Sequence, residues 1–278
     1  MSFRAEPSER AGGAVRQGQR KARIEERHFQ YDGVSIHYQV AGHGEPVVLI
    51  HGLSGSGRWW RRNVEPLARR FRVHVVDLVG FGLSRDGRFV LHDAASHLTA
   101  WLDSLGIERA HVIGHSMGGA IAADLAADFP ARVGRLVLVD AAAVPFNRTY
   151  LQHALGLLRG LCYLPLGFLP VLAADACRAG PLTLLQAARD LLSADLTAKL
   201  PRIQAPARLI WGERDFLVPL ELGRELCRSL RHADLVVIEG AGHNPMWDRP
   251  TEFNRAVLEF LAADSASLEA DSAVYSAA

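Results

Sequence analysis

The chain has 278 residues, of which 49% are hydrophobic and 22% charged, and its formal net charge is +1. A chain of this length and composition folds into one large α/β domain, with or without an insertion. A net charge close to zero gives no electrostatic reason to expect a nucleic-acid or acidic membrane partner. The three cysteines form no CxxC pair, which argues against a disulfide framework and against a zinc site.

The two ends of the chain differ in composition from its middle. Residues 1–27 are polar and rich in arginine, without the apolar stretch of a secretory signal, and residues 263–278 are small and polar. We expect both ends to be disordered or weakly helical. Because no secretory signal is visible in residues 1–27, we expect the protein to be cytoplasmic. The most apolar stretch, residues 160–174, contains two prolines and is too short to cross a bilayer, so no integral membrane association is expected.

Short β-branched runs alternate with amphipathic helical patterns along the middle of the chain. The first two runs are separated by Asp32 and Gly33, which predict a β-hairpin. Apolar strands joined by helices predict a mostly parallel eight-stranded sheet covered by helices on both faces. The six later runs lie at 46–50, 73–76, 110–113, 136–139, 207–211 and 235–238.

The alternation is interrupted once, in residues 141–200, where no strand pattern is present and charged residues are sparse. This segment predicts a helical cap inserted after the sixth strand, with apolar side chains facing inward. Residues 28–140 and 201–262 then form the α/β core on which the cap lies.

A glycine-rich turn follows the third predicted strand, in the sequence HGLSGSG. Asp77 ends the next strand, as an acidic residue does in dinucleotide-binding units. However, Gly52, Gly55 and Gly57 have the spacing GxxGxG rather than GxGxxG, and no phosphate-binding GxxxxGK[ST] motif is present. The turn therefore predicts no nucleotide cofactor, but a backbone that bends sharply and directs the amide after Gly52 into a cleft.

A serine lies between the fifth predicted strand and the following helix, in the sequence GHSMG. A strand that turns directly into a helix strains the residue at the turn, so positions two residues away must lack side chains. Gly114 and Gly118 meet this need. The turn lifts the Ser116 hydroxyl above the sheet at a helix N-terminus, where free amides stabilise negative charge. Ser116 is therefore predicted to be a nucleophile rather than a simple helix cap.

A serine nucleophile needs a base, and the base needs an acid that orients it. Asp215 follows the strand ARLIW, and His243 follows the next strand, LVVI. The chain order Ser116, Asp215, His243 is expected when all three lie in loops at the carboxyl edge of one parallel sheet. Asp140 also ends a strand and is an alternative acid, although the sequence around Asp215 favours the latter.

These motifs resemble the α/β-hydrolase superfamily, and in particular its cap-bearing, esterase-like serine hydrolases, over residues 28–262. The resemblance rests on HGLSGSG, DLVGFGLS, GHSMGG, GERD and GAGHNPMWDRPTEF. It implies that Ser116 is the nucleophile, His243 the general base and Asp215 its orienting acid. One departure from the family pattern is Val79, where relatives usually have proline.

The resemblance also implies an oxyanion hole and an activity. The backbone amides of Leu53 and Met117 would form the oxyanion hole. Epoxide hydrolases and haloalkane dehalogenases of this fold carry aspartate in place of the serine, which argues against both. We therefore expect a carboxylesterase, independent of cofactors and metals, that forms an acyl-enzyme on small to medium apolar acyl substrates. The candidate substrate contacts are Phe146, Tyr150, Phe168 and Trp247.

Several other functions are compatible with the same residues. A lactonase, a thioesterase, a carbon–carbon bond hydrolase and a cofactor-free perhydrolase all use this triad. A ligand-binding receptor without activity is an alternative of another class, because a fold does not determine a function. In every case the expected partner is a small molecule, of the ester type for our main hypothesis, while the oligomeric state stays open.

Overall fold

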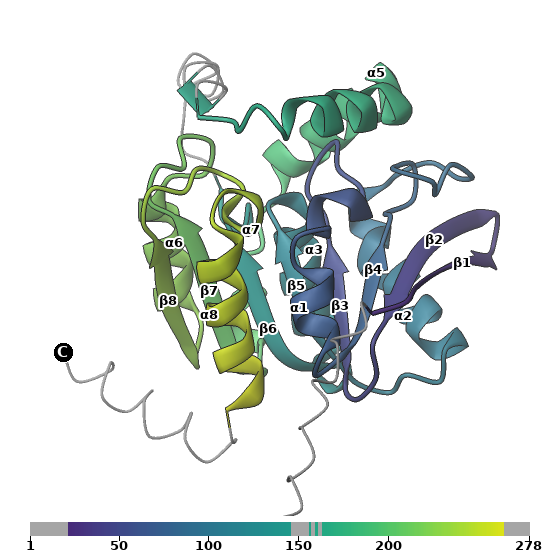
Figure 1. Ribbon diagram of the computed structural model, residues 1–278, viewed down its shortest axis with the longest axis horizontal. Helices are drawn as coiled ribbons and strands as arrows, with labels where there is room; N and C mark the ends of the chain where they lie inside the picture. Colours follow the sequence, from purple (N-terminus) through teal and green to yellow (C-terminus); the bar gives the residue numbers. More distant parts are fainter. Residues whose placement is uncertain (1–21, 146–155, 157–158, 161–162, 264–278) are drawn as a thin grey trace, which may run out of the picture.

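The computed structural model describes residues 22–145, 156, 159–160 and 163–263, and its strands form one sheet (Figure 1). The sheet has eight strands in the order β1-β2-β4-β3-β5-β6-β7-β8. β2 pairs antiparallel with β1 and with β4, whereas the neighbouring pairs from β4 through β8 are parallel. The prediction of a mostly parallel eight-stranded sheet is confirmed.

The elements have the following bounds. The strands are β1 (Ile24–Tyr31), β2 (Val34–Ala41), β3 (Pro46–Ile50), β4 (Arg72–Val76), β5 (Ala110–His115), β6 (Val133–Val139), β7 (Ala207–Gly212) and β8 (Ala233–Ile238). The α-helices are α1 (Val64–Ala68), α2 (Ala94–Ser104), α3 (Met117–Asp128), α5 (Leu169–Ser193), α6 (Leu220–Ser229), α7 (Pro245–Asp248) and α8 (Pro250–Ala262). The 3₁₀ helices are η1 (Gly57–Trp60), η2 (Leu91–Asp93), η3 (Pro130–Arg132) and η4 (Leu200–Arg202).

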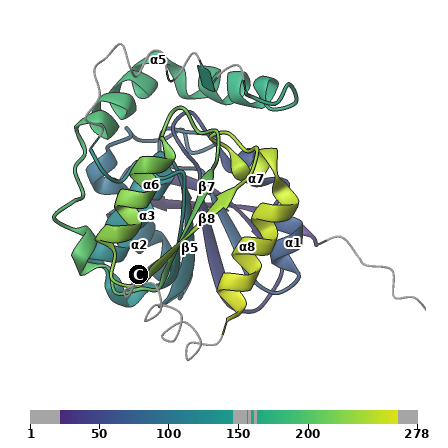
Figure 2. The same cartoon turned by 90° about the vertical axis from the view of Figure 1, so that its left-hand side faces the viewer.

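Helices cover both faces of the sheet (Figure 2). α2, α3 and α6 lie on one face, and α1 and α8 lie on the other. The central strands β3, β5 and β6 are almost entirely buried, as expected for parallel strands between two helical layers. Among the described residues, no helix is both long enough and apolar enough to cross a bilayer.

The N-terminal hairpin forms where the sequence predicts it. Asp32 and Gly33 both have positive φ, 46° and 76°, as a two-residue hairpin turn requires. β1 begins at Ile24, so the sheet includes residues that the sequence analysis assigned to the N-terminal arm.

The described part of residues 141–200 contains one long helical element and lies above one end of the sheet (Figure 1). This element, α5, is bent where Gly180 adopts φ 77° and ψ 160° and Pro181 follows. Proline cannot donate a backbone hydrogen bond, so the bend divides α5 into two helical halves. Both halves contribute side chains to a cavity over the carboxyl ends of the strands.

Candidate active site

Ser116 occupies the turn between β5 and α3 in a strained backbone conformation. Its φ is 52° and its ψ is −116°, which is unusual for a residue with a side chain. Backbone hydrogen bonds hold it there: Ser116 N donates to Val139 O at 2.9 Å, and Ala142 N donates to Ser116 O at 3.2 Å. The strain is therefore maintained by β6 and the residues that follow it.

The two glycines around Ser116 leave no room for a side chain. A Cβ atom at Gly114 would lie 2.2 Å from the carbonyl oxygen of Gly118. A Cβ atom at Gly118 would lie 2.4 Å from the carbonyl oxygen of His51. Both contacts are with backbone, which cannot rotate away. The close approach of β5, α3 and the loop after β3 therefore depends on glycine at both positions.

His243 and Asp215 form a hydrogen bond at the carboxyl ends of β8 and β7. His243 Nδ1 lies 2.7 Å from Asp215 Oδ2, and the Asp215 side chain is fully buried. The other carboxylate oxygen, Oδ1, accepts hydrogen bonds from the amides of Leu217 (2.8 Å) and Val218 (3.0 Å). These bonds fix the carboxylate, so the Nδ1 hydrogen points toward it and Nε2 is left free on the cavity side.

Asp140, the alternative acid, lies beside this pair but makes a different bond. Its Oδ1 accepts from the amide of Gly212 at 2.9 Å, whereas its Oδ2 is buried without a hydrogen-bond partner among the described residues. Burial, and then the negative charge of Asp215, raise the pKa of the Asp140 carboxyl well above its ordinary value. The structure therefore places Asp215, and not Asp140, against Nδ1 of His243.

The loop after β3 packs against Ser116. A Cβ atom at Gly52 would lie 3.1 Å from Ser116 Cβ. Ser54 has a φ of 61°, and Gly55 N donates to Gly52 O at 3.0 Å, which closes a tight turn around Leu53. Leu53, Ser54 and Ser116 line the same cavity. Met117 is the first residue of α3, directly after Ser116.

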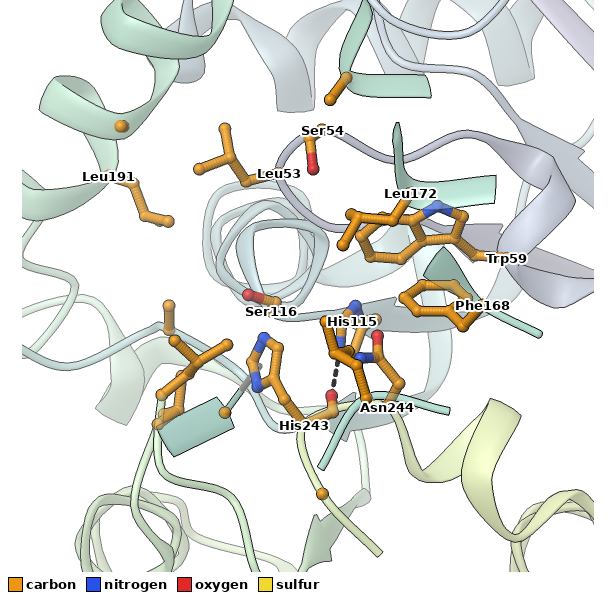
Figure 3. Close-up of a pocket in the computed structure, with 18 of the residues that line it drawn as sticks. Leu53, Ser54, Trp59, His115, Ser116, Phe168, Leu172, Leu191, His243 and Asn244 are labelled. Carbon is orange, nitrogen blue, oxygen red and sulfur yellow. Dashed lines mark hydrogen bonds between the residues drawn. The ribbon is translucent and has the colours of Figure 1, made fainter. Parts of the chain in front are cut away.

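His115 joins the serine turn to the histidine loop, a role that the sequence analysis missed. Its Nε2 lies 2.7 Å from the backbone carbonyl of His243, and because a carbonyl only accepts, Nε2 carries the hydrogen (Figure 3). Burial, and then the charge of His243, lower the pKa of His115 well below its ordinary value, which favours the neutral ring. A neutral ring can keep this hydrogen bond without adding a positive charge beside His243.

Ser116 and His243 lie side by side in the lining of a cavity of about 720 Å³ (Figure 3). The core supplies its polar side chains. Apart from Tyr163, the described lining residues from the cap have no polar side-chain atoms. Most of these are leucines, namely Leu164, Leu172, Leu184, Leu185, Leu191 and Leu192.

The predicted substrate contacts have different outcomes. Phe168 lines the cavity, with its ring 5.1 Å from that of Trp59. Trp247 is fully buried one layer behind, with its ring 4.8 Å from that of Phe168, and is not among the described residues that line the cavity. The prediction for Trp247 is corrected accordingly: it supports Phe168 from behind. Phe146 and Tyr150 lie outside the described residues.

Three further polar residues line the cavity; they lie within the motifs GERD and GAGHNPMWDRPTEF, but the sequence analysis did not predict them as site residues. Asn244, directly after His243, has a buried Oδ1 without a partner among the described residues. Asp248 Oδ2 accepts from the amide of Gly242 at 2.8 Å, and burial raises the pKa of this carboxyl to about 6. Arg214 is the one cationic side chain among the described lining residues, and about half of that side chain is exposed.

The part of the chain that the structure describes contains one cluster with metal-ligand geometry, formed by His115, Asp140 and His243. Their donor atoms lie within 4.8 Å of one another. However, His115 Nε2 is bonded to a carbonyl, and His243 Nδ1 is bonded to Asp215. Each histidine ring is oriented by its bond within the serine site, so these contacts account for the cluster without an ion, and we assign no metal to it.

The strained serine, the histidine–carboxylate pair and the apolar cavity together define an α/β-fold hydrolase. The chain belongs to the α/β hydrolase family, whose model matches residues 47–256. Among its relatives is the 2-hydroxy-6-oxononadienedioate/2-hydroxy-6-oxononatrienedioate hydrolase of Paraburkholderia xenovorans, which is 34% identical over 82% of this chain and 91% of that protein. The 2-hydroxy-6-oxo-6-phenylhexa-2,4-dienoate hydrolase of Comamonas testosteroni is 32% identical over 81% and 91%.

The chain is also similar to solved structures over most of its length. The enol-lactonase from Burkholderia xenovorans superposes with a TM-score of 0.71 at 25% identity, covering 85% of this chain and 100% of that one. These relatives are named as hydrolases of oxo-dienoates and not as carboxylesterases, so the comparisons support the prediction of a hydrolase but not its narrower form, a carboxylesterase.

Proposed function

We propose that Ser116 attacks a carbonyl carbon of the substrate while His243 accepts the hydroxyl proton through Nε2. Asp215 holds the imidazole in the required tautomer and stabilises the imidazolium that forms. The amides of Leu53 and Met117 stabilise the negative charge that develops on the carbonyl oxygen. The 2.7 Å hydrogen bond between His243 and Asp215, beside a strained serine in the same cavity, supports these roles.

The bond that we propose is cleaved is a carbon–carbon bond next to a ketone. In a 2-hydroxy-6-oxo-dienoate, hydrolysis between carbons 5 and 6 turns the ketone carbon into a carboxylic acid and adds a proton to carbon 5. This chemistry needs a nucleophile, an oxyanion hole and a group that returns a proton, and these are the roles proposed above. Relatives named for such substrates at 31–35% identity support this choice.

The cavity favours one kind of dienoate. Its cap side is formed by leucines, and its one described cationic lining residue, Arg214, is half-exposed. An apolar group on the ketone carbon fits the leucine surface, whereas a second carboxylate there would lose its hydration without a counter-charge. The substrate's single carboxylate then lies toward Arg214. This contrast between an apolar wall and one cation is the observation that carries the proposal.

The test compares substrates on one enzyme. We expect kcat/KM for 2-hydroxy-6-oxo-6-phenylhexa-2,4-dienoate to exceed that for 2-hydroxy-6-oxononadienedioate by at least about tenfold, a difference that pocket polarity can supply. Arg214→Gln raises KM for the phenyl dienoate and leaves KM for the neutral ester p-nitrophenyl butyrate within about twofold. An equal effect on both substrates contradicts the placement of the carboxylate.

Ester or lactone hydrolysis is the second candidate. The apolar cap side supports it, as does the likeness to an enol-lactonase. It becomes the better description if p-nitrophenyl butyrate or an enol-lactone has a higher kcat/KM than either dienoate. No turnover of any of these substrates, together with no covalent labelling of Ser116, favours the receptor.

A further inference from the structure

The loop that carries the Leu53 amide is held from the core by hydrogen bonds. The amide of Gly57 donates to Asp77 Oδ1 at 2.6 Å. His51 Nδ1 donates to Gly52 O at 2.8 Å, because His51 Nε2 accepts from the Leu78 amide and is therefore unprotonated. These contacts fix both ends of the short segment between Gly52 and Gly57.

The same loop is also held from the cap, by a carboxylate that the mechanism does not use. Ser56, next to Gly57, donates from Oγ to Asp175 Oδ2 at 2.8 Å, across 119 positions of sequence. Asp175 lies in the first half of α5 and is fully buried, and Ser56 is 2% exposed. A hydrogen bond between two buried groups is costly to break, because the group left behind cannot turn to water.

Two arginines also donate hydrogen bonds to Asp175. Its Oδ1 accepts from Arg58 Nη1 at 3.2 Å and from Arg178 Nη1 at 3.1 Å. Both arginine side chains are more than two-fifths exposed, so water screens these pairs and each contributes little alone. These arginines offset part of the cost of burying the negative charge of Asp175. The hydrogen bond to Ser56 fixes the position of the loop relative to α5.

This link lies directly behind the wall of the cavity. On α5, Leu172 and Ala176 are near Asp175 in sequence and line the cavity. On the loop, Leu53 and Ser54 come shortly before Ser56 and line it too. A displacement of Ser56 therefore also displaces the nearby backbone amide of Leu53, which the proposed function places at the oxyanion.

We propose that Asp175 is a positioning residue through which the cap sets the geometry of the oxyanion loop. This proposal rests on the role of Leu53 under the proposed function. The cap then has two separable tasks. Its leucines shape the cavity, and Asp175, the one fully buried carboxylate among the described cap residues, fixes a backbone amide of the core. A displacement of about 1 Å in such a group costs on the order of 10² in rate.

The test uses p-nitrophenyl acetate, whose acyl group is too short to depend on the leucines. Asp175→Asn and Ser56→Ala should each lower kcat by about tenfold or more, with KM within about twofold and an unchanged pH profile of kcat/KM. In Asp175→Asn the single acceptor oxygen turns to the two arginines, so that the NH2 group faces Ser56 and the link loses its geometry. The double variant should be no slower than the slower single variant, because both changes break one link.

The control is a second polar attachment of the cap to the core. Lys199 forms ion pairs with Asp124 and Asp128 of α3, away from the oxyanion loop. Lys199→Gln should leave kcat for the acetate within about twofold. An equal loss of kcat in Lys199→Gln and Asp175→Asn would show that only cap attachment matters, and would overturn the proposal.

The remaining outcomes are also decisive. Unchanged kcat in both Asp175→Asn and Ser56→Ala overturns the proposal while the proposed function stands. If Asp175→Asn does not fold, Ser56→Ala decides alone, because it removes one hydroxyl, together with the 3.3 Å bond that this oxygen accepts from the Arg58 amide, and leaves the carboxylate with its two arginines. A wild type that neither turns over the acetate nor reacts with a fluorophosphonate overturns the proposed function and this inference together.

Discussion

The core side and the cap side of the cavity are built in opposite ways. On the core side the backbone is tightly determined: Ser54, Ser116 and Asp140 are three of the four described non-glycine residues with positive φ. On the cap side the helix is bent at Gly180, and a Cβ atom at Gly167 would meet nothing within 4 Å. Leucines there are also widely exposed, including Leu166 (86%), Leu182 (82%) and Leu185 (61%).

This difference indicates where chemistry and selectivity are located. Strained conformations survive only where the surrounding structure holds them, and here they surround the serine and the carboxylates. An apolar wall with room to adjust tolerates changes of shape better than a fixed polar site does. We therefore expect changes on the core side to remove activity, and changes on the cap side to redirect it.

The strongest test of the core side is the serine itself. Ser116→Ala should lower kcat by on the order of 10⁶, since the residues of such a triad act as a unit. Mass spectrometry of the wild type treated with a fluorophosphonate should locate the adduct on Ser116. Ser54→Ala is the matched control, because Ser54 lines the same cavity and also has a positive φ. It should still be labelled at Ser116, whereas an adduct on Ser54 in the wild type would contradict the assignment.

The next test separates the two carboxylates near His243. Asp215→Asn should lower kcat by on the order of 10⁴, because the amide no longer favours the Nδ1–H tautomer. Asp140→Asn should lower it by less than about tenfold, since Asp140 bonds to the Gly212 amide and the side-chain amide oxygen of asparagine can accept in its place. Steady-state kinetics at neutral pH decide, and the reverse order would move the acid to Asp140.

A third test uses one glycine from each side. A Cβ atom at Gly114 would lie 2.2 Å from the backbone oxygen of Gly118, so Gly114→Ala should reduce the free energy of unfolding by about 3 kcal/mol or more. Gly167→Ala, in the cap, has open space and should change it by less than about 0.5 kcal/mol. Urea unfolding of both variants measures the difference. Equal losses would mean that the cap backbone is as constrained as the core.

The cap side should respond in selectivity instead. Leu191 lines the cavity, whereas Leu182 does not and is 82% exposed. Leu191→Ala should shift the ratio of kcat/KM for long and short acyl chains by about tenfold in favour of the long ones. Leu182→Ala should leave this ratio unchanged. Loss of all turnover in Leu191→Ala, with an intact fold by circular dichroism, would show that the cap also carries chemistry.

The sequence predicted the core side better than the cap side for a physical reason. Ser116, Asp215 and His243 each follow a strand of one parallel sheet, so their order along the chain already implies a common edge. The bond from His115 could not be found in this way, because its acceptor is a backbone carbonyl, which every residue has. Asp175 was missed because a lone carboxylate on an apolar helix is usually exposed, and its partner lies 119 residues away.

The smallest expected effect concerns Asp248, the core-side carboxyl whose pKa burial raises from 3.8 to about 6. Between these two values the folded protein keeps a proton that the unfolded chain has released. Its free energy of unfolding therefore falls as the pH rises through that window. Two pKa units correspond to about 3 kcal/mol, and partial solvent access reduces this to about 1–2 kcal/mol.

Asp248→Asn should remove this loss, because asparagine carries no charge at any pH and its oxygen can still accept from the Gly242 amide. Relative to the wild type, the variant should gain about 1–2 kcal/mol between pH 4 and pH 7 in urea unfolding. Leu192→Ala, a substitution in the cap wall, should lower the stability equally at both pH values, since no titrating group is changed. A wild type and an Asp248→Asn variant with parallel pH dependence would show that Asp248 is ionised in the folded protein at pH 4. The polar side of the cavity would then be more open to water than its burial indicates.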